Sequence, residues 1–323
     1  MPDPRTILIT GGAGFIGSHL VDALVGRGEA VRVLDDFSTG QHTNPETEVI
    51  TGDVADVDIV ERAVAGVDVV FHLAAHRAVL RSVEHPLATD RANTFGTLNV
   101  LKASADAGVR RVVYSSSSSV YGGAEQLPTP IDAPLVPRSP YAVSKVAGEH
   151  YSRVFAELYE LETVSLRYFN VYGPRQRPDS RYAAVIPLFI RALARGEPPE
   201  VHGDGTQSRD FTYISDVVDA NLAAAEAPAE AASGRAFNVA GGRPYSLLEL
   251  LEILGRITGG SSAPTFTAPR PGDVRHTWAD IESAAEALGY RPAVSFEEGL
   301  SRTVAWFHSE LAPAALRSDG EPM

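Results

Sequence analysis

The first residues of the chain restrict its fold more than any other stretch. Residues 6–10 form a short apolar, β-branched run that predicts a buried strand. The glycine-rich segment from Gly11 to Gly17 follows at once, and residues 18–27 have the amphipathic pattern of a helix. Gly11 permits a tight turn, and Gly17 permits close packing of the helix on the strand. A strand, a glycine turn and a helix in this order predict a parallel α/β sheet.

The same alternation continues through the first half of the chain. We expect further strands at residues 30–34, 49–51, 67–73, 111–116 and 163–169. Helices are expected at residues 57–65, 90–106 and 141–158, and a Pro- and Gly-rich loop at residues 122–139. This pattern predicts an α/β protein with a Rossmann-type doubly wound parallel sheet, whose ligands bind at the carboxyl ends of the strands.

The regular alternation weakens after residue 172. We expect a first domain over residues 1–172 and a smaller C-terminal α/β domain over residues 173–310, with a disordered tail at residues 311–323. The chain is expected to return to the first domain near residues 210–245, through a strand at residues 236–240. Helices are predicted at residues 185–195, 215–225, 247–258 and 296–309, and a flexible joint at residues 258–264.

The glycine turn also suggests a ligand. Gly14 would let the backbone approach a pyrophosphate, which the N-terminus of the following helix would attract. Asp35 follows Gly11 by 24 residues and ends the second predicted strand. A carboxylate there accepts hydrogen bonds from ribose hydroxyls and repels a 2′-phosphate, so NAD is favoured over NADP. The wider cofactor site is expected to include Phe15, Ile16, Asp36, Ser38, Thr39, Gly40, Asp53, Val54, Leu73, Ala74, Ala75 and Ser115.

Tyr141 and Lys145 are four residues apart and therefore share one face of a predicted helix. An ammonium group, aided by an oxidised nicotinamide, can lower the pKa of a phenol from about 10 and make it a general base. The chain has only two lysines, Lys102 and Lys145, against 26 arginines, so a lysine at this position is informative. The serine run from Ser115 to Ser119 precedes this helix.

Composition excludes several other functions. The net charge of −13 argues against nucleic-acid or anionic-membrane binding. The chain has no cysteine, which excludes disulfides and thiol catalysis, and His72 and His76 straddle a strand end, so no metal site is expected. No apolar run is long enough to span a membrane, and the first residues lack a signal-peptide pattern, so a cytoplasmic location is expected.

These motifs together resemble the extended short-chain dehydrogenase/reductase superfamily, and within it the NAD-dependent nucleotide-sugar epimerase/dehydratase family. The resemblance extends from Thr10-Gly-Gly-Ala-Gly-Phe-Ile-Gly17 to Arg270-Pro-Gly-Asp273. It implies that Tyr141 is the base, Lys145 its partner and Ser117 the catalytic serine, with Ser118 beside the substrate. Tyr168 and Phe169 would flank the nicotinamide. The implied UDP-sugar site contains Asn170 at the diphosphate, Val185 and Pro187 in a nucleotide-binding helix, Val201 and His202 at the base, the diphosphate clamp Arg209 and Arg270, and Asp273 at the uridine ribose.

Ser118 and Ser119 stand where dehydratases and decarboxylases of this family carry acids. A 4-epimerase is therefore favoured, with Tyr141 taking the 4-hydroxyl proton, directly or through Ser117, while NAD takes and returns the hydride. The sugar stays open. Thr277 is small and would leave room for an N-acetyl group, while Arg177 matches an arginine that holds the carboxylate in UDP-glucuronate 4-epimerases. UDP-glucose, UDP-N-acetylglucosamine and UDP-glucuronate are all candidates.

Two alternatives remain at this point. One is a nucleotide-sugar 4,6-dehydratase or 4-keto reductase of the same superfamily. The other is a non-catalytic dinucleotide sensor, which could dispense with Tyr141, Lys145 and Ser117. The resemblance also implies a homodimer that pairs through the helices at residues 90–106 and 141–158.

Overall fold

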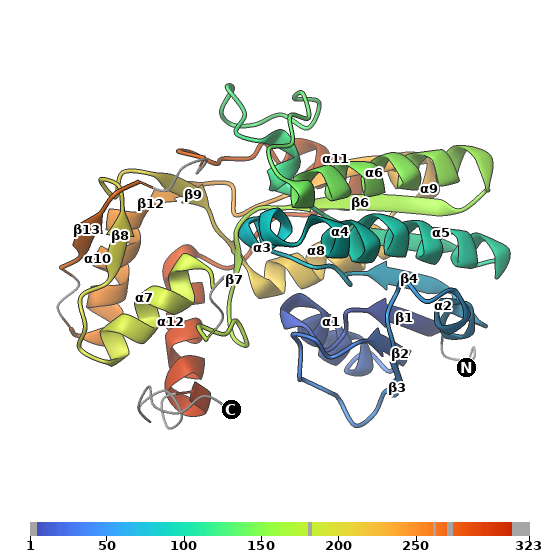
Figure 1. The fold of residues 1–323 in the computed structure, drawn as a ribbon, viewed down its shortest axis with the longest axis horizontal. Helices are drawn as coiled ribbons and strands as arrows, with labels where there is room; N and C mark the ends of the chain where they lie inside the picture. Colours follow the sequence, from blue (N-terminus) through green and yellow to red (C-terminus); the bar gives the residue numbers. More distant parts are fainter. Residues whose placement is uncertain (1–4, 180–182, 261–262, 270–273, 312–323) are drawn as a thin grey trace.

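The computed structural model describes residues 5–179, 183–260, 263–269 and 274–311, and a seven-stranded sheet lies at its centre (Figure 1). The strand order is β11-β6-β5-β4-β1-β2-β3, and every pairing is parallel. The predicted doubly wound α/β fold is confirmed. The strands are β1 (Thr6–Thr10), β2 (Ala30–Asp35), β3 (Glu48–Thr51), β4 (Val69–His72), β5 (Arg111–Ser117), β6 (Glu162–Tyr168) and β11 (Arg235–Val239).

Helices cover both faces of this sheet. Because side chains alternate along a strand, Ile7 and Ile9 of β1 enter one core while Leu8 enters the other. The first core is closed by α1 (Phe15–Val25), α8 (Ile214–Glu226) and α11 (Glu282–Leu288), with the short α9 (Ala229–Ala232) beside them. The second is closed by α2 (Val57–Val64), α5 (Gly96–Asp106) and α6 (Pro140–Leu158), which pack side by side.

Helix α1 begins at Phe15, three residues before the predicted start. Gly14 precedes it with an extended backbone (φ −76°, ψ 177°) and serves as its N-cap. Gly17 therefore lies inside the first turn of the helix. A Cβ atom on Gly17 would stand 2.2 Å from the carbonyl oxygen of Gly11, so only glycine fits between the helix and the turn.

The helix predicted at residues 90–106 is longer and less regular than expected. It begins with α4 (Pro86–Asp90), continues through a π-helical turn at Arg91–Phe95 and ends as α5. The π turn carries Asn93, whose amide oxygen accepts a hydrogen bond from the backbone of His76 and whose Nδ2 donates to the hydroxyl of Ser144. Such turns often mark functional sites, and this one reaches the segment after β4. The sequence pattern did not predict α3 (Val79–Glu84).

The C-terminal part forms its own apolar core beside the sheet. Its helices are α7 (Val185–Ala194), α10 (Leu247–Thr258) and α12 (Phe296–Trp306), the last extended by a π-helical turn at Phe307–Leu311. They match the predicted helices to within a few residues. Three two-stranded sheets pair β7 (Val171–Tyr172) with β10 (Thr212–Tyr213), β9 (Ser208–Asp210) with β12 (Pro244–Ser246), and β8 (Glu200–His202) with β13 (Thr265–Thr267).

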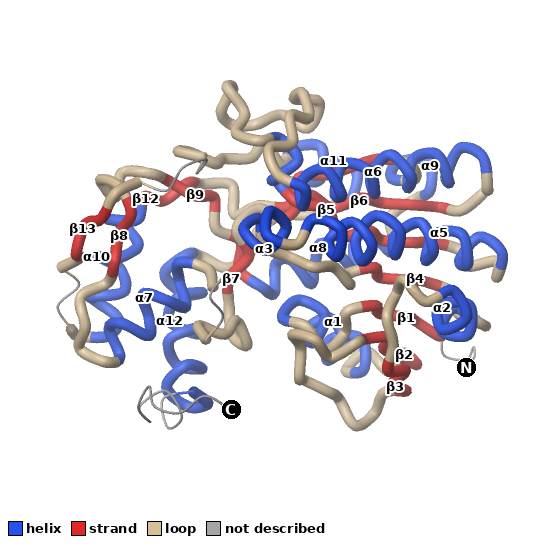
Figure 2. Tube along the Cα trace, in the orientation of Figure 1, coloured by secondary structure: helices blue, strands red, loops and turns tan. Residues whose placement is uncertain are grey.

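The tube view shows how these parts meet (Figure 2). Strand β7 runs between the central sheet and the C-terminal helices, at the edge where the parallel strands end. Strand β11 joins the sheet beside β6. Two residues of the predicted joint at residues 258–264 lie outside the described part of the chain. Arg270, Asp273 and the predicted tail after residue 311 also lie outside it.

Candidate active site

A cavity of about 930 Å³ opens at the carboxyl ends of β1, β2, β4 and β5. Every residue expected to contact the cofactor lines this cavity except Phe169. Phe169 is buried instead, and its ring packs against Tyr121 with 6.2 Å between centroids. The ends of the parallel strands thus gather one continuous site, as the fold requires.

The glycine turn forms one wall of the cavity. Gly11 has a φ of 73°, a left-handed backbone that favours glycine, and it connects β1 to α1. The first turn of α1 borders the cavity with Phe15, Ile16 and Gly17. The N-terminus of a helix carries partial positive charge and free N–H groups, so this wall is suited to a diphosphate.

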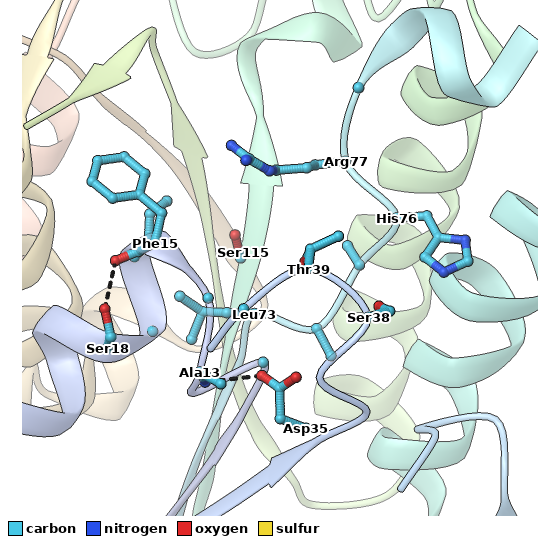
Figure 3. Close-up of a pocket in the computed structure, with 18 of the residues that line it drawn as sticks. Ala13, Phe15, Ser18, Asp35, Ser38, Thr39, Leu73, His76, Arg77 and Ser115 are labelled. Atoms are coloured by element: carbon cyan, nitrogen blue, oxygen red, sulfur yellow. Dashed lines mark hydrogen bonds between the residues drawn. The ribbon is translucent and has the colours of Figure 1, made fainter. Parts of the chain in front are cut away.

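Asp35 stands at the end of β2, beside this turn. Its Oδ2 accepts a hydrogen bond from the backbone of Ala13 at 2.9 Å, drawn in Figure 3, and its Oδ1 accepts one from Phe37 at 2.8 Å. Burial raises the pKa of Asp35, and the two amide hydrogen bonds act in the opposite direction. A carboxylate oxygen has a second lone pair, so Asp35 can still accept from a ribose hydroxyl.

Asp22 on α1 joins two loops that border the same cavity. It accepts hydrogen bonds from Asn44 Nδ2 at 2.8 Å and Arg175 Nη2 at 2.6 Å. Burial raises the pKa of Asp22, but the hydrogen bonds from Asn44 and Arg175 outweigh it and lower the pKa overall. We call Asp22, Asn44 and Arg175 the Asp22 clasp. It fastens the loop after β2 to the loop after β7.

Tyr141, Lys145 and Ser117 meet at the other end of the cavity. Pro140 starts α6 and Ser139 caps it, accepting a hydrogen bond from the backbone of Ala142 at 3.1 Å. This places Tyr141 in the first turn, where its phenol shares a hydrogen bond with the hydroxyl of Ser117. Lys145, one turn later, is buried.

The Lys145 ammonium points past Tyr141 toward the sheet. Its Nζ donates to the carbonyl oxygen of Ser115 at 2.6 Å and stands 4.9 Å from the ring centroid of Tyr114 and 5.9 Å from that of Tyr141. Burial lowers the pKa of Lys145 to about 7, and Glu149 opposes this change. The Ser115 carbonyl and the rings of Tyr114 and Tyr141 hold the Lys145 ammonium. Burial strongly destabilises its charged form.

The pKa of Tyr141 differs from the sequence-based expectation. Burial raises it, while the hydrogen bond from Ser117 and the charge of Arg77 lower it in part. The expected lowering by Lys145 is absent from these causes, because a lysine whose own pKa is lowered to about 7 has lost its charge at the pH where a phenol titrates. The positive charge of an oxidised nicotinamide would be a further lowering influence here.

Sequence reasoning missed Arg77. It follows the small residues Ala74 and Ala75 that end the β4 segment, and it lines the cavity opposite Asp35 in Figure 3. The next residue, Ala78, has a φ of 95°, which L-residues seldom adopt. The only available signal was a basic residue two positions after the paired alanines. Arg77 supplies a positive charge beside the phenol of Tyr141.

The residues predicted to hold the substrate divide into two groups. Ser117, Ser118, Asn170 and Arg177 line the cavity. The described others lie outside it in the C-terminal part, at the start of α7 (Val185, Pro187), in β8 (Val201, His202), in β9 (Arg209) and before α11 (Thr277).

Two contacts in this region are specific. Thr277 Oγ1 accepts a hydrogen bond from Asn170 Nδ2 at 3.0 Å and so meets the cavity wall. Arg209 Nη1 donates to the carbonyl oxygens of Ser208, at 2.9 Å, and Arg275, at 3.1 Å.

Carboxylates in the cavity lie away from Tyr141. The acidic residues that line it, within the described part of the chain, are Asp35, Asp36, Asp53 and Asp179. None of them influences the pKa of Tyr141, whose charged neighbour is Arg77. Asp179 pairs with Arg177 at 2.7 Å. Proton transfer at this end of the cavity therefore depends on Tyr141 and Ser117.

No group of three or more His, Cys, Asp and Glu side chains that could hold a metal ion occurs among the described residues. The ring nitrogens of His72 face Thr10 at 2.7 Å and Thr97 at 2.9 Å, and burial lowers the pKa of His72 to about 3, so it stays neutral. Within the same part of the chain, no helix has the length and apolar character needed to cross a membrane.

Comparisons with known proteins agree with this geometry. The model of the NAD dependent epimerase/dehydratase family matches residues 7–240. The UDP-glucose 4-epimerase of Mycolicibacterium smegmatis is 40% identical, covering 94% of this chain and 98% of its own.

Two solved structures are also similar. The UDP-N-acetylglucosamine 4-epimerase of Methanobrevibacter ruminantium has a TM-score of 0.91 at 39% identity, covering 95% of this chain and 99% of its own. The UDP-glucuronic acid 4-epimerase of Bacillus cereus, in complex with UDP-glucuronic acid and NAD, has a TM-score of 0.87 at 34% identity and covers 94% and 99%.

Proposed function

This chain belongs to the NAD dependent epimerase/dehydratase family, and from that premise we propose that it interconverts two UDP-sugars that differ in configuration at C4. It is an enzyme that uses NAD as its cofactor. The observation that carries the proposal is the absence of a carboxylate beside Tyr141 among the described residues. Inversion at C4 needs one base and a hydride carrier, whereas elimination of water needs a further acid or base.

The mechanism follows from where these side chains lie. When bound, NAD supplies a reversible hydride acceptor for C4 of the sugar. The N-terminus of α1 would hold its diphosphate and Asp35 its ribose. Tyr141 would remove the proton of the 4-hydroxyl, directly or through Ser117, and later return it. Lys145 would orient the cofactor ribose and support the negative phenol oxygen.

We propose that residues 173–310 mainly bind the nucleotide of the substrate. Arg209 would contact the diphosphate, because a guanidinium can donate two parallel hydrogen bonds to a phosphate group. Val185 and Pro187 begin α7, and His202 ends β8 at the predicted position of the base. Arg270 and Asp273, which lie outside the described residues, are proposed to complete the clamp and to bind the ribose.

We propose that the substrate is UDP-glucose or UDP-N-acetylglucosamine. Thr277, which accepts a hydrogen bond from Asn170 at the cavity wall, is a small residue, and a small residue at this position favours acceptance of a larger C2 substituent. UDP-glucuronate is the second candidate, because Arg177 lines the cavity and could hold a carboxylate. Against it, the Arg177 guanidinium is paired with Asp179, and a uronate would have to replace that partner.

A homodimer is part of the proposal. Helices α4 and α6 expose apolar side chains, among them Leu87 at 86%, Leu158 at 73% and Val143 at 53%. Side chains of this kind favour a second copy of the chain as the partner of this face.

Proton NMR with UDP-glucose, UDP-N-acetylglucosamine and UDP-glucuronate, each with NAD, tests the proposal. The expected result is a two-component mixture with a changed H4 coupling. Tyr141→Phe should lower kcat by about 10²- to 10⁴-fold with NAD retained, while Tyr159→Phe at the exposed end of α6 should not. A product that has lost water or become a stable ketone would instead indicate a dehydratase. If none of the sugars is converted, and Tyr141→Phe leaves the biological effect of the protein unchanged, the protein would instead be a non-catalytic sensor.

A further inference from the structure

A buried ion pair lies directly behind the catalytic end of the cavity. Arg167 of β6 donates to Glu149 of α6 through Nε at 2.9 Å and through Nη2 at 2.7 Å. Both side chains are only 7% exposed. Burying two charges is expensive, and a bidentate arrangement is the geometry that best offsets this. Neither residue borders the cavity, so the proposed proton transfer does not use them directly.

Glu149 also holds the strand that carries the catalytic serine. The hydroxyl of Ser116, in β5, donates to Glu149 Oε1 in a short hydrogen bond. Ser116 lies between Ser115, whose carbonyl accepts from Lys145, and Ser117, whose hydroxyl meets Tyr141. Because neighbouring residues of a strand move together, the anchor at Ser116 fixes both of these contacts.

Arg167 holds the other end of the same segment. Its Nη1 donates to the hydroxyl of Tyr121 at 2.7 Å and to the carbonyl oxygen of Ile131 at 2.8 Å. Tyr121 closes the short helix after β5 and donates in turn to Asn238 of β11 at 2.7 Å. The ion pair therefore holds the segment from Ser116 to Tyr121 by hydrogen bonds at both of its ends.

Glu149 also lies one turn after Lys145 on α6, and it is the carboxylate that favours the charged form of Lys145. The other titratable groups near this site do not supply negative charge at neutral pH. His72 is neutral, burial raises the pKa of the phenols of Tyr114 and Tyr141 as long as no nicotinamide charge is present, and Arg77 and Arg167 are cations.

We propose that Glu149 is a positioning residue for the proton transfer at Tyr141, acting through Ser116 on the Ser115 carbonyl and the Ser117 hydroxyl, and through its charge on Lys145. This inference rests on the proposed function for its kinetic consequence only. The electrostatic part can be measured without any turnover, because the chain has just two lysines.

The direct test labels the holoenzyme with [ε-¹³C]lysine and titrates both lysines by NMR. Glu149→Gln removes a negative charge and leaves the charge of Arg167 without its carboxylate partner, and both changes disfavour protonated Lys145. The pKa of Lys145 should fall by about one unit. Lys102, which is exposed and paired with Asp106, is the internal reference and should not shift. Glu157→Gln, at an exposed position of α6, is the matched control.

The kinetic test uses the pH dependence of kcat with the UDP-sugar that is turned over. If catalysis needs protonated Lys145, the alkaline limb of the kcat–pH profile of Glu149→Gln should move to lower pH. The size of this move should equal the fall in the pKa of Lys145. Ser116→Ala breaks the anchor without changing charge, and it should lower kcat about 10-fold with the limb unmoved. Should Glu149→Gln fail to fold, Glu149→Asp keeps the charge and should behave as Ser116→Ala does.

An unchanged Lys145 pKa in Glu149→Gln would overturn the inference even if the sugar is epimerised. So would a Ser116→Ala variant with full kcat. A shifted Lys145 pKa in a protein that converts none of the three UDP-sugars would support the electrostatic part and count against the proposed function instead.

Discussion

Lys145 lowers the stability of the fold that holds it. The residue is 3% exposed, and burial lowers its pKa from 10.5 to about 7. The difference, 10.5 minus 7, is 3.5 units, and each unit is worth about 1.4 kcal/mol. At pH 7, where half the folded molecules are protonated, the destabilisation is therefore about 4 kcal/mol. Lys145→Met keeps the apolar stem and removes the charge.

The substitution also removes favourable contacts. The charged hydrogen bond to the Ser115 carbonyl is worth about 1.5–3 kcal/mol. We therefore expect Lys145→Met to raise the free energy of unfolding at pH 7 by about 2 kcal/mol, while it abolishes turnover. The wild-type protein should also become more stable as pH rises from 7 toward 10.5, because the unfolded chain then binds the proton that the folded one has released.

Urea unfolding of cofactor-stripped protein at pH 6, 7, 8 and 9 measures both effects. Lys102→Met is the matched control, since Lys102 is exposed and should contribute no such pH dependence. The reasoning is refuted if Lys145→Met is less stable than the wild type at pH 7, or if the stability difference between the two proteins does not shrink above pH 7.

Three further outcomes are expected. Gly17→Ala should abolish NAD binding or folding, since its Cβ would lie 2.2 Å from the Gly11 oxygen; cofactor retained on gel filtration would contradict this. Asp22→Asn should speed the loss of NAD about 10-fold in a dialysis assay, because Arg175 loses its charged partner, and an unchanged rate would remove the role of the clasp. Leu158→Glu should convert the proposed dimer to a monomer in sedimentation measurements, whereas a dimer of unchanged stability would place the interface elsewhere.

The features that sequence predicted are those whose chemistry is local. The glycine turn, Asp35 at the end of a strand and the Tyr141–Lys145 spacing each depend on a few consecutive residues. The fold followed from the strand and helix alternation for the same reason. Helix ends were less accurate, because the start of α1 depends on how Gly17 packs against Gly11, a contact that the helical pattern does not encode.

The features that sequence missed depend on contacts between distant segments. Arg167 and Glu149 lie on different elements, and nothing in either segment marks them as partners. The raised pKa of Tyr141 reflects burial that only the folded protein creates. The small paired strands, such as β8 with β13, are only two or three residues long and carry no readable period.

The Asp22 clasp joins α1 to two loops that border the cavity of the proposed cofactor. A dinucleotide held in this cavity would exchange with the surrounding pool more slowly than the enzyme turns over. Each molecule would then use the same bound hydride acceptor through many reactions. A ketone that escaped in mid-reaction would leave its enzyme idle until a similar ketone returned. Under this arrangement, retention of the keto sugar matters as much as the rate of turnover, because each intermediate that is released leaves one enzyme molecule inactive.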